Sequence, residues 1–153
     1  MRSEETIDYF LKVVWQSVAN HYNRIAADYG ITQALGYALI NIHEEGTPVS
    51  QIAALMGVKS TSLSRMLTSM EELGLIYREG NKADKRSVKI FLTDYGKEKR
   101  QVAKEVVRKF NEYLNENIPE AERLQLISSL VRVNQLVQNY PASSGVKAPD
   151  LQP

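Results

Sequence analysis

The stretch that decides the fold is residues 49–68, which read VSQIAALMGVKSTSLSRMLT. Ile52, Ala53 and Met56 fall on one face of a 3.6-residue period, which predicts a short helix with one buried side. Gly57 follows at the point where this helix must stop, because glycine adopts the left-handed backbone conformation without steric cost. The pattern therefore predicts a helix that ends at a glycine and a second helix that begins almost at once.

The second predicted helix separates its apolar side chains from its polar ones. Leu63, Met66 and Leu67 form its buried side. Its outward face carries short hydrogen-bonding groups and one guanidinium, which suit a DNA major groove that long acidic or apolar groups would block. The residues of this face are Ser60, Thr61, Ser62, Ser64, Arg65 and Thr68. We interpret the stretch as a helix-turn-helix whose second helix reads DNA; the alternative is a plain helical hairpin with a solvated Ser/Thr-rich face.

The composition of the chain limits its class. A chain of 153 residues, 43% hydrophobic and 24% charged, is ordinary for one soluble globular domain. Because there is no cysteine, disulfides, cysteine–zinc sites and thiol redox sensing are excluded. No apolar run is long enough to span a membrane and no signal-peptide pattern opens the chain, so we expect a cytoplasmic protein.

The net charge of +1 is no signature of DNA binding, but the distribution of charge is informative. Residues 57–93 hold seven basic and four acidic side chains, whereas residues 1–56 hold three basic and six acidic ones. The positive excess thus lies on the helix-turn-helix and the segment after it, where a phosphate backbone would require it.

The residues after Gly74 predict a β wing. Two β-prone runs, residues 75–78 and 87–92, flank a polar basic loop at residues 79–86. Two strands joined by such a loop, directly after a recognition helix, form a wing whose tip enters the minor groove. Lys82 and Lys85 supply positive charge there, and Arg86 suits a narrow, electronegative groove. The alternative is an ordinary solvated hairpin tip.

Long amphipathic helices are expected on both sides of this unit. The first runs over residues 3–29 with Ser3 as its cap, and the second over residues 32–44 with Thr32 as its cap. Thr47-Pro48 is expected to open the third helix, with Thr47 as the cap. Two further helices are predicted at residues 94–117, capped by Thr93, and at residues 119–139.

The apolar stripes of the first, fifth and sixth helices exceed what one small lobe needs. We therefore expect a symmetric homodimer; the alternative is that these helices pack on each other within one chain. The predicted organisation is mainly α with a small β wing. It comprises a helical dimerisation region (residues 1–30 and 94–140), a winged helix-turn-helix DNA-binding domain (residues 31–93) and a flexible tail (residues 141–153).

This order of elements resembles the MarR family of bacterial transcriptional regulators over about Ser3 to Asn139. The most specific parts are residues 52–65, 71–76, 84–87 and 92–96. The resemblance implies a homodimer on a pseudo-palindromic operator, usually a repressor that a small apolar or aromatic acid releases. It also implies that residues 60–68 contact bases and phosphates and that Arg86 enters the minor groove, with Asp84 holding the wing in shape.

Gly36 stands inside a predicted helix, where glycine costs about 1 kcal/mol relative to alanine. Many relatives in the family carry a bulky aromatic residue there, near the ligand cavity. We hypothesise a roomier pocket that admits an extended apolar ligand such as an acyl chain. Its expected lining is Trp15, Val18, Tyr22, Gly36, Tyr37, His43 and Phe110; the alternative is that these are core or solvated side chains. We expect no metal and no cofactor apart from such an effector.

Other functions fit the sequence less well. The carboxylates are scattered, and no Ser/His/Asp grouping or phosphate-binding glycine loop indicates an enzyme. RNA binding would call for stacking aromatic residues on an exposed sheet, and the sequence does not show them. The main alternative is a winged-helix protein-interaction module without DNA binding, which would leave the clustered basic wing unexplained.

Overall fold

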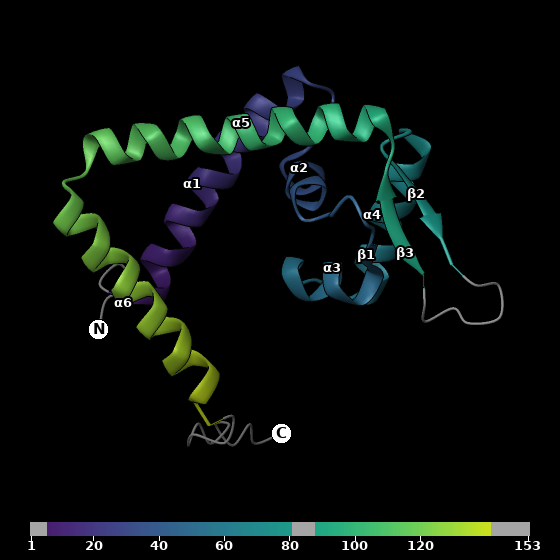
Figure 1. Cartoon of the computed structure of the whole chain (residues 1–153). Helices are drawn as coiled ribbons and strands as arrows, with labels where there is room; N and C mark the ends of the chain where they lie inside the picture. The colour runs from purple at the N-terminus through teal and green to yellow at the C-terminus, as the bar shows by residue number, and fades with distance from the viewer. Residues whose placement is uncertain (1–5, 81–87, 142–153) are drawn as a thin grey trace, which may run out of the picture. The chain divides into compact units, whose positions relative to one another are not determined.

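The computed structural model describes residues 6–80 and 88–141, and its chain divides into two compact units, Met1–Lys109 and Phe110–Pro153 (Figure 1). The first unit holds, in order, α1 (Ile7–Asp28), α2 (Gln33–Ile40), β1 (Thr47–Pro48), α3 (Val49–Met56), α4 (Ser60–Glu72), β2 (Ile76–Glu79) and β3 (Lys89–Leu92). Helix α5 (Asp94–Asn117) begins in the first unit and ends in the second, which also holds α6 (Glu120–Asn139). The predicted fold class, mainly α with a small β wing, is confirmed.

The hydrophobic core lies where α2, α3, α4 and the sheet meet. Ile52 of α3 and Leu63 of α4 are fully buried there, together with Leu39 of α2 and Ile90 of β3. Burial of one such side chain contributes about 1.5–3 kcal/mol. The predicted buried faces are confirmed, with Ala53, Met56 and Met66 half-buried against this core. This packing fixes α4 on one side and leaves its other side to solvent.

The turn between α3 and α4 forms as the sequence predicts. Gly57 adopts a left-handed φ of 61° and ends α3 with a hydrogen bond from its N–H to the Ala54 carbonyl. Val58 follows and packs half-buried against the core. The two helices therefore diverge sharply over three residues, as a helix-turn-helix requires.

The sheet has three antiparallel strands in the order β1-β3-β2. In the central strand, Ile90 and Leu92 face the core while Lys89 is exposed, so successive side chains alternate between the core and solvent. The rings of Tyr77 and Phe91 stack at 5.4 Å across the β2–β3 pair. The hairpin thus extends from the core toward residues 81–87, the expected wing tip, which lie outside the described residues.

The expectation that Thr47 caps the third helix is wrong. Thr47 belongs to β1, where it pairs with Ile90 of β3. Its side chain is fully buried and accepts a hydrogen bond from the His43 backbone N–H at 2.8 Å. Its hydroxyl is therefore committed to the preceding loop, and Pro48 occupies the cap position without a side-chain bond. Proline is tolerated in β1 because this strand lies at the edge of the sheet.

Two other helix ends differ from expectation. Thr6, not Ser3, caps α1 through a bond from the Tyr9 N–H, and Ser3 itself lies outside the described residues. Helix α2 starts after Thr32 as predicted but ends at Ile40, four residues early. The chain leaves the helix there because Ile42 turns into the core and the His43 N–H bonds Thr47 instead of a helical carbonyl.

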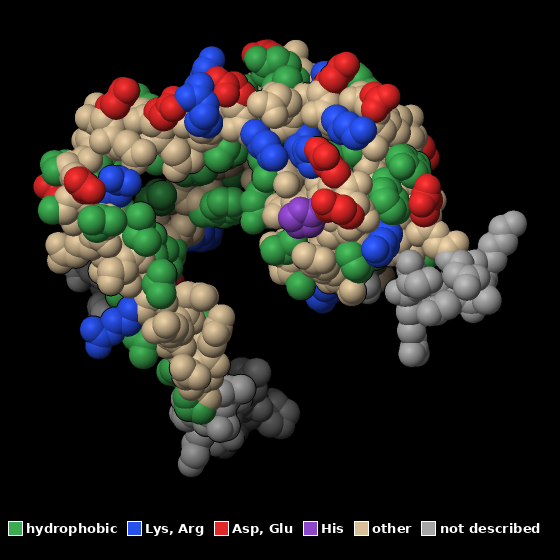
Figure 2. All heavy atoms as spheres, in the orientation of Figure 1, with side chains coloured by type: hydrophobic (Ala, Val, Ile, Leu, Met, Phe, Trp, Pro, Cys, Tyr) green, Lys and Arg blue, Asp and Glu red, His purple; other side chains and the backbone are tan. Residues whose placement is uncertain are grey.

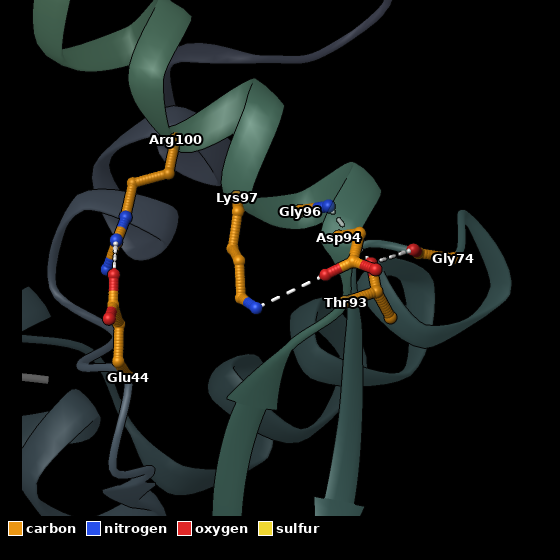
Figure 3. A network of polar contacts seen from close by, with 7 residues as sticks. All are labelled: Glu44, Gly74, Thr93, Asp94, Gly96, Lys97 and Arg100. Carbon is orange, nitrogen blue, oxygen red and sulfur yellow. Dashed lines mark hydrogen bonds and ion pairs between the residues drawn. The ribbon is translucent and has the colours of Figure 1, made fainter.

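Polar contacts fasten the start of α5 to the rest of the first unit (Figure 3). The Thr93 hydroxyl donates to the Gly74 carbonyl at 2.6 Å and accepts from the Gly96 N–H at 2.9 Å, so Thr93 caps α5 as predicted. Gly96 is required, because a Cβ there would collide with the Leu75 carbonyl oxygen. Arg100 donates to the Ile42 carbonyl and pairs with Glu44 at 2.8 Å.

Helices α1 and α6 bury none of their residues within the described chain. Figure 2 shows hydrophobic side chains at the surface along α6. The described exposed apolar residues of α6 are Leu124, Leu126, Ile127, Leu130, Val131, Leu136 and Val137. No helix among the described residues is long and apolar enough to cross a membrane.

Candidate nucleic-acid interface

Helix α4 presents one polar and one apolar face. Leu63, Leu67 and Met70 are at most 1% exposed, and their spacing of four and three residues places them on the side that meets the core. The opposite side carries the predicted reading face, of which Thr61, Ser62, Ser64, Arg65 and Thr68 are all exposed. Ser60, the remaining member, is the first residue of α4. The structure therefore brings these five exposed residues onto one surface.

Two of these residues differ in what their polar groups do. The Thr68 hydroxyl donates to the Ser64 carbonyl at 3.0 Å and accepts from the Arg78 guanidinium at 3.2 Å. Arg78 in turn pairs with Glu71 at 2.8 Å, which joins the end of α4 to β2. Arg65, by contrast, makes no hydrogen bond or ion pair with any residue that the structure describes. Thr68 thus helps to hold α4 against β2, while Arg65 is available to a ligand.

The start of α4 is also open to an anion. Lys59 occupies the N-cap position, and its side chain makes no capping hydrogen bond. Such N–H groups and the helix dipole favour a phosphate. On the wing, Lys89 is exposed on β3. The predicted wing contacts Lys82, Asp84, Lys85 and Arg86 lie outside the described residues, so their placement stays a prediction.

A second feature of the first unit is a cavity of about 210 Å³ between α1, α2 and α5. Of the predicted lining residues, Trp15, Tyr22, Gly36 and Tyr37 do line it. Val18, His43 and Phe110 do not: His43 is exposed in the loop after α2, and Phe110 belongs to the second unit. The remaining lining residues are Ala26, Tyr29, Ile31, Thr32, Gln33, Ile40, Val102, Ala103, Val106 and Val107.

Gly36 lies where the lining of α2 approaches α5. A Cβ added to Gly36 would stand 3.6 Å from the Ala103 Cβ and 3.8 Å from the Ile31 Cδ1, which is ordinary contact. Alanine would therefore fit, whereas a large side chain would have to occupy the cavity. The glycine keeps this volume empty, in line with the hypothesis of a roomier pocket, whose ligand remains a prediction.

The cavity disfavours charge. None of its lining residues is Asp, Glu, Lys, Arg or His. Burial raises the pKa of the Tyr22 phenol, because the apolar surroundings destabilise the phenolate. Among the described residues, no group of three or more His, Asp and Glu side chains is placed to hold a metal ion.

None of the α5 residues that line the cavity was predicted from the sequence. Val102 and Val106 stood on the apolar stripe of that helix, so their spacing signalled burial of some kind. Nothing local indicated that α5 would face α1 and α2 at this point. That meeting depends on contacts distant in sequence, such as the bond from the Lys99 ammonium to the Tyr29 carbonyl at 2.7 Å.

Comparisons with known proteins agree with this architecture. Residues 31–88 match the sequence profile of the MarR family. YdgJ of Bacillus subtilis (strain 168), an uncharacterized HTH-type transcriptional regulator, is 26% identical over 114 residues, which are 74% of this chain and 70% of YdgJ.

Two solved structures with bound DNA have the same fold. S. aureus MepR in complex with DNA superposes with a TM-score of 0.78 at 20% identity, covering 85% of this chain and 97% of MepR. The transcriptional repressor CouR bound to a 23-mer duplex gives 0.74 at 26% identity, covering 86% of this chain and 94% of CouR. The helix-turn-helix of α3 and α4 lies within the segment that matches the MarR family, and the chain shares its fold with these two DNA-bound proteins.

Proposed function

We propose that the chain is a sequence-specific DNA-binding repressor that acts as a homodimer. Residues 31–93 bind DNA, and residues 1–30 and 94–140 form the dimer. The observation that carries this proposal is the exposed polar face of α4, held in place by Leu63, Leu67 and Met70 in the core beneath it. The presence of DNA in the MepR and CouR structures supports it.

In the proposed complex α4 lies in the major groove. The Arg65 guanidinium is the group best suited to a bidentate contact with guanine, and the hydroxyls of Ser60, Thr61, Ser62 and Ser64 contact bases or phosphates. Thr68 contributes chiefly by holding Arg78 and the end of the helix. Lys82, Lys85 and Arg86 of the wing contact the phosphates and minor groove of the same half-site.

The exposed apolar faces of α1 and α6 support the dimer. Phe10 and Val14 of α1 are 55% and 58% exposed, and Leu136 and Val137 of α6 are 61% and 67% exposed. Exposure of so large an apolar surface to water is unfavourable, so it marks a site of contact with another molecule. A two-fold dimer would bury these faces and present two α4 helices to a pseudo-palindromic operator.

The cavity supports release by a small apolar or aromatic effector. Its walls come from α2, inside the proposed DNA-binding domain, and from α1 and α5, which belong to the proposed dimerisation region. A ligand that binds one arrangement of these helices more tightly shifts the population toward it. Release follows when that arrangement places the two α4 helices at a spacing that does not fit the operator.

The DNA-binding part of the proposal is tested with DNA from upstream of the chain's own gene. Affinity is measured at several salt concentrations for the wild type, for Arg86→Ala and for the control Arg132→Ala on α6. We expect a steep loss of affinity with salt. Arg86→Ala should reduce the slope by about two, because each dimer loses two guanidinium groups, while Arg132→Ala should leave it unchanged. Absent or salt-independent binding would favour a winged-helix protein-interaction module instead.

A further inference from the structure

We infer that the cavity between α1, α2 and α5 selects uncharged aromatic ligands and discriminates against organic anions. This inference rests on the proposed effector role of the cavity and names the class of its ligand. It departs from the aromatic acid that the family resemblance implies.

The cavity wall is apolar at its floor and aromatic at its mouth. Ile31, Gly36 and Ala103 are buried and apolar, so the deep part offers no partner to a charged group. Trp15 and Tyr37 are 59% and 44% exposed, so the mouth is aromatic. An anion at the floor would lose its hydration without gaining a positive partner, and an anion held at the mouth would leave the floor unfilled.

Lys99 is a cation beside the cavity, but other groups hold its ammonium. The Lys99 ammonium donates to the backbone carbonyl of Tyr29 at 2.7 Å and lies 5.2 Å from the centre of the Tyr95 ring. Lys99 is not a lining residue, and its charge is engaged with these two groups. The raised pKa of Tyr22 agrees, because the surroundings that destabilise a phenolate also destabilise a bound carboxylate.

The cavity lining offers aromatic ring surface and a few uncharged polar groups. Trp15, Tyr22, Tyr29 and Tyr37 contribute ring surface, which suits stacked or edge contacts with a flat ligand. The Thr32 hydroxyl accepts from the Leu35 N–H at 3.2 Å, and its O–H can still donate to one polar group of a ligand. The Gln33 amide can pair with one neutral polar group. A fused or substituted aromatic compound with a single hydroxyl or amide matches this set.

The experiment uses the full chain and the neutral dye N-phenyl-1-naphthylamine as a reporter. Trp15 is the only tryptophan of the chain and lines the cavity, so energy transfer from it reports dye bound at this place. Three competitors share one naphthyl scaffold: 2-naphthalenemethanol, 2-naphthoate and trimethyl(2-naphthylmethyl)ammonium. We expect the alcohol to displace the dye at a concentration about tenfold or more below that needed for the naphthoate.

Matched variants locate the site. Gly36→Ala should keep dye binding, because its Cβ makes only ordinary contacts, whereas Gly36→Phe should abolish it by filling the cavity. Val106→Phe serves the same purpose from α5 if Gly36→Phe does not fold. Gln33→Lys adds the missing positive charge and should strengthen displacement by naphthoate without strengthening displacement by the alcohol.

The outcomes separate this inference from the proposed function. Equal or better competition by the naphthoate or by the ammonium compound would overturn the selectivity, and dye binding that survives both phenylalanine variants would overturn the site. DNA affinity is measured in parallel without any compound. If DNA binding persists while dye binding is absent, only this inference fails; if selective dye binding persists without DNA binding, only the proposed function fails.

Discussion

Helices α4 and α6 carry apolar side chains at similar spacings, yet the chain treats them in opposite ways. In α4, Leu63 and Leu67 are 0% and 1% exposed, and what faces solvent is polar. In α6, Ile127 and Leu136 are 50% and 61% exposed, and none of its residues is buried. Apolar periodicity alone therefore does not tell which helix a single chain will cover.

This difference in exposure indicates that the two helices have different binding partners. The apolar side of α4 is satisfied within the chain, so its exposed polar face is free to meet a polar partner such as DNA. The apolar side of α6 is unsatisfied, so we propose that a second copy of the chain covers it. Four substitutions test this contrast.

Truncation of the α4 core should have the largest effect. Leu67→Ala should lower the free energy of unfolding by about 2–5 kcal/mol, because it opens a cavity in a fully buried site. Leu136→Ala on α6 should instead lower the free energy of unfolding by an amount that increases with protein concentration, because the dimer alone would bury Leu136. Urea denaturation at several protein concentrations measures both. A loss under about 1 kcal/mol for Leu67→Ala would remove the contrast.

A charge on the apolar face of α6 should come next. Ile127→Glu should halve the mass seen by sedimentation velocity, because a carboxylate cannot be buried unpaired in the interface. DNA affinity should fall about 100-fold as the second half-site contact is lost. Gln125→Glu on the same helix is the matched control and should remain a dimer. An unchanged mass for Ile127→Glu would mean that another surface forms the dimer.

Loss of the free guanidinium on α4 should follow. Arg65→Ala should weaken operator binding by about 1–3 kcal/mol and relax the base preference at one position of each half-site. Arg132→Ala removes the same charge from α6 and should have no such effect. Gel-shift titrations on operators with single base changes measure both. If the two variants weaken binding equally and uniformly, Arg65 acts only through its charge.

The smallest effect is expected at Thr68, although it shares the exposed face of α4. Its hydroxyl is occupied by the Ser64 carbonyl and Arg78, so Thr68→Val should change DNA affinity by less than about threefold. The free energy of unfolding should change by no more than the loss of one exposed polar contact would cause. Gel-shift titration of operator DNA with Thr68→Val and with Arg65→Ala in parallel checks this prediction. A loss as large as that of Arg65→Ala would show that Thr68 reads a base.

Local chemistry predicted the parts of the fold that local chemistry decides. The left-handed turn at Gly57, the cap at Thr93 and the alternation around Ile90 are each specified within a few residues. Thr47 was misassigned because its hydroxyl is equally suited to capping a helix and to bonding the His43 N–H. A two-residue strand exists only through its partner, so β1 could not be seen without β3.

The candidate sites divide in the same way. The reading face of α4 follows from helical periodicity, because one helix carries all of its members. The cavity is built from three helices far apart in sequence, so only the aromatic residues of α1, with Gly36 and Tyr37 of α2, were identified. His43 was misplaced with them because α2 ends at Ile40, before the helix can carry it to the lining.

The central claim is that the polar face of α4 reads DNA in pairs. Selection of bound sequences from a random duplex library by the wild-type chain tests it most directly. We predict an enriched inverted repeat whose half-sites are centred about 10 base pairs, one helical turn, apart, with the position read by Arg65 relaxed in Arg65→Ala. Enrichment of no sequence, or of a single unrepeated motif that Arg65→Ala leaves unchanged, would contradict the account.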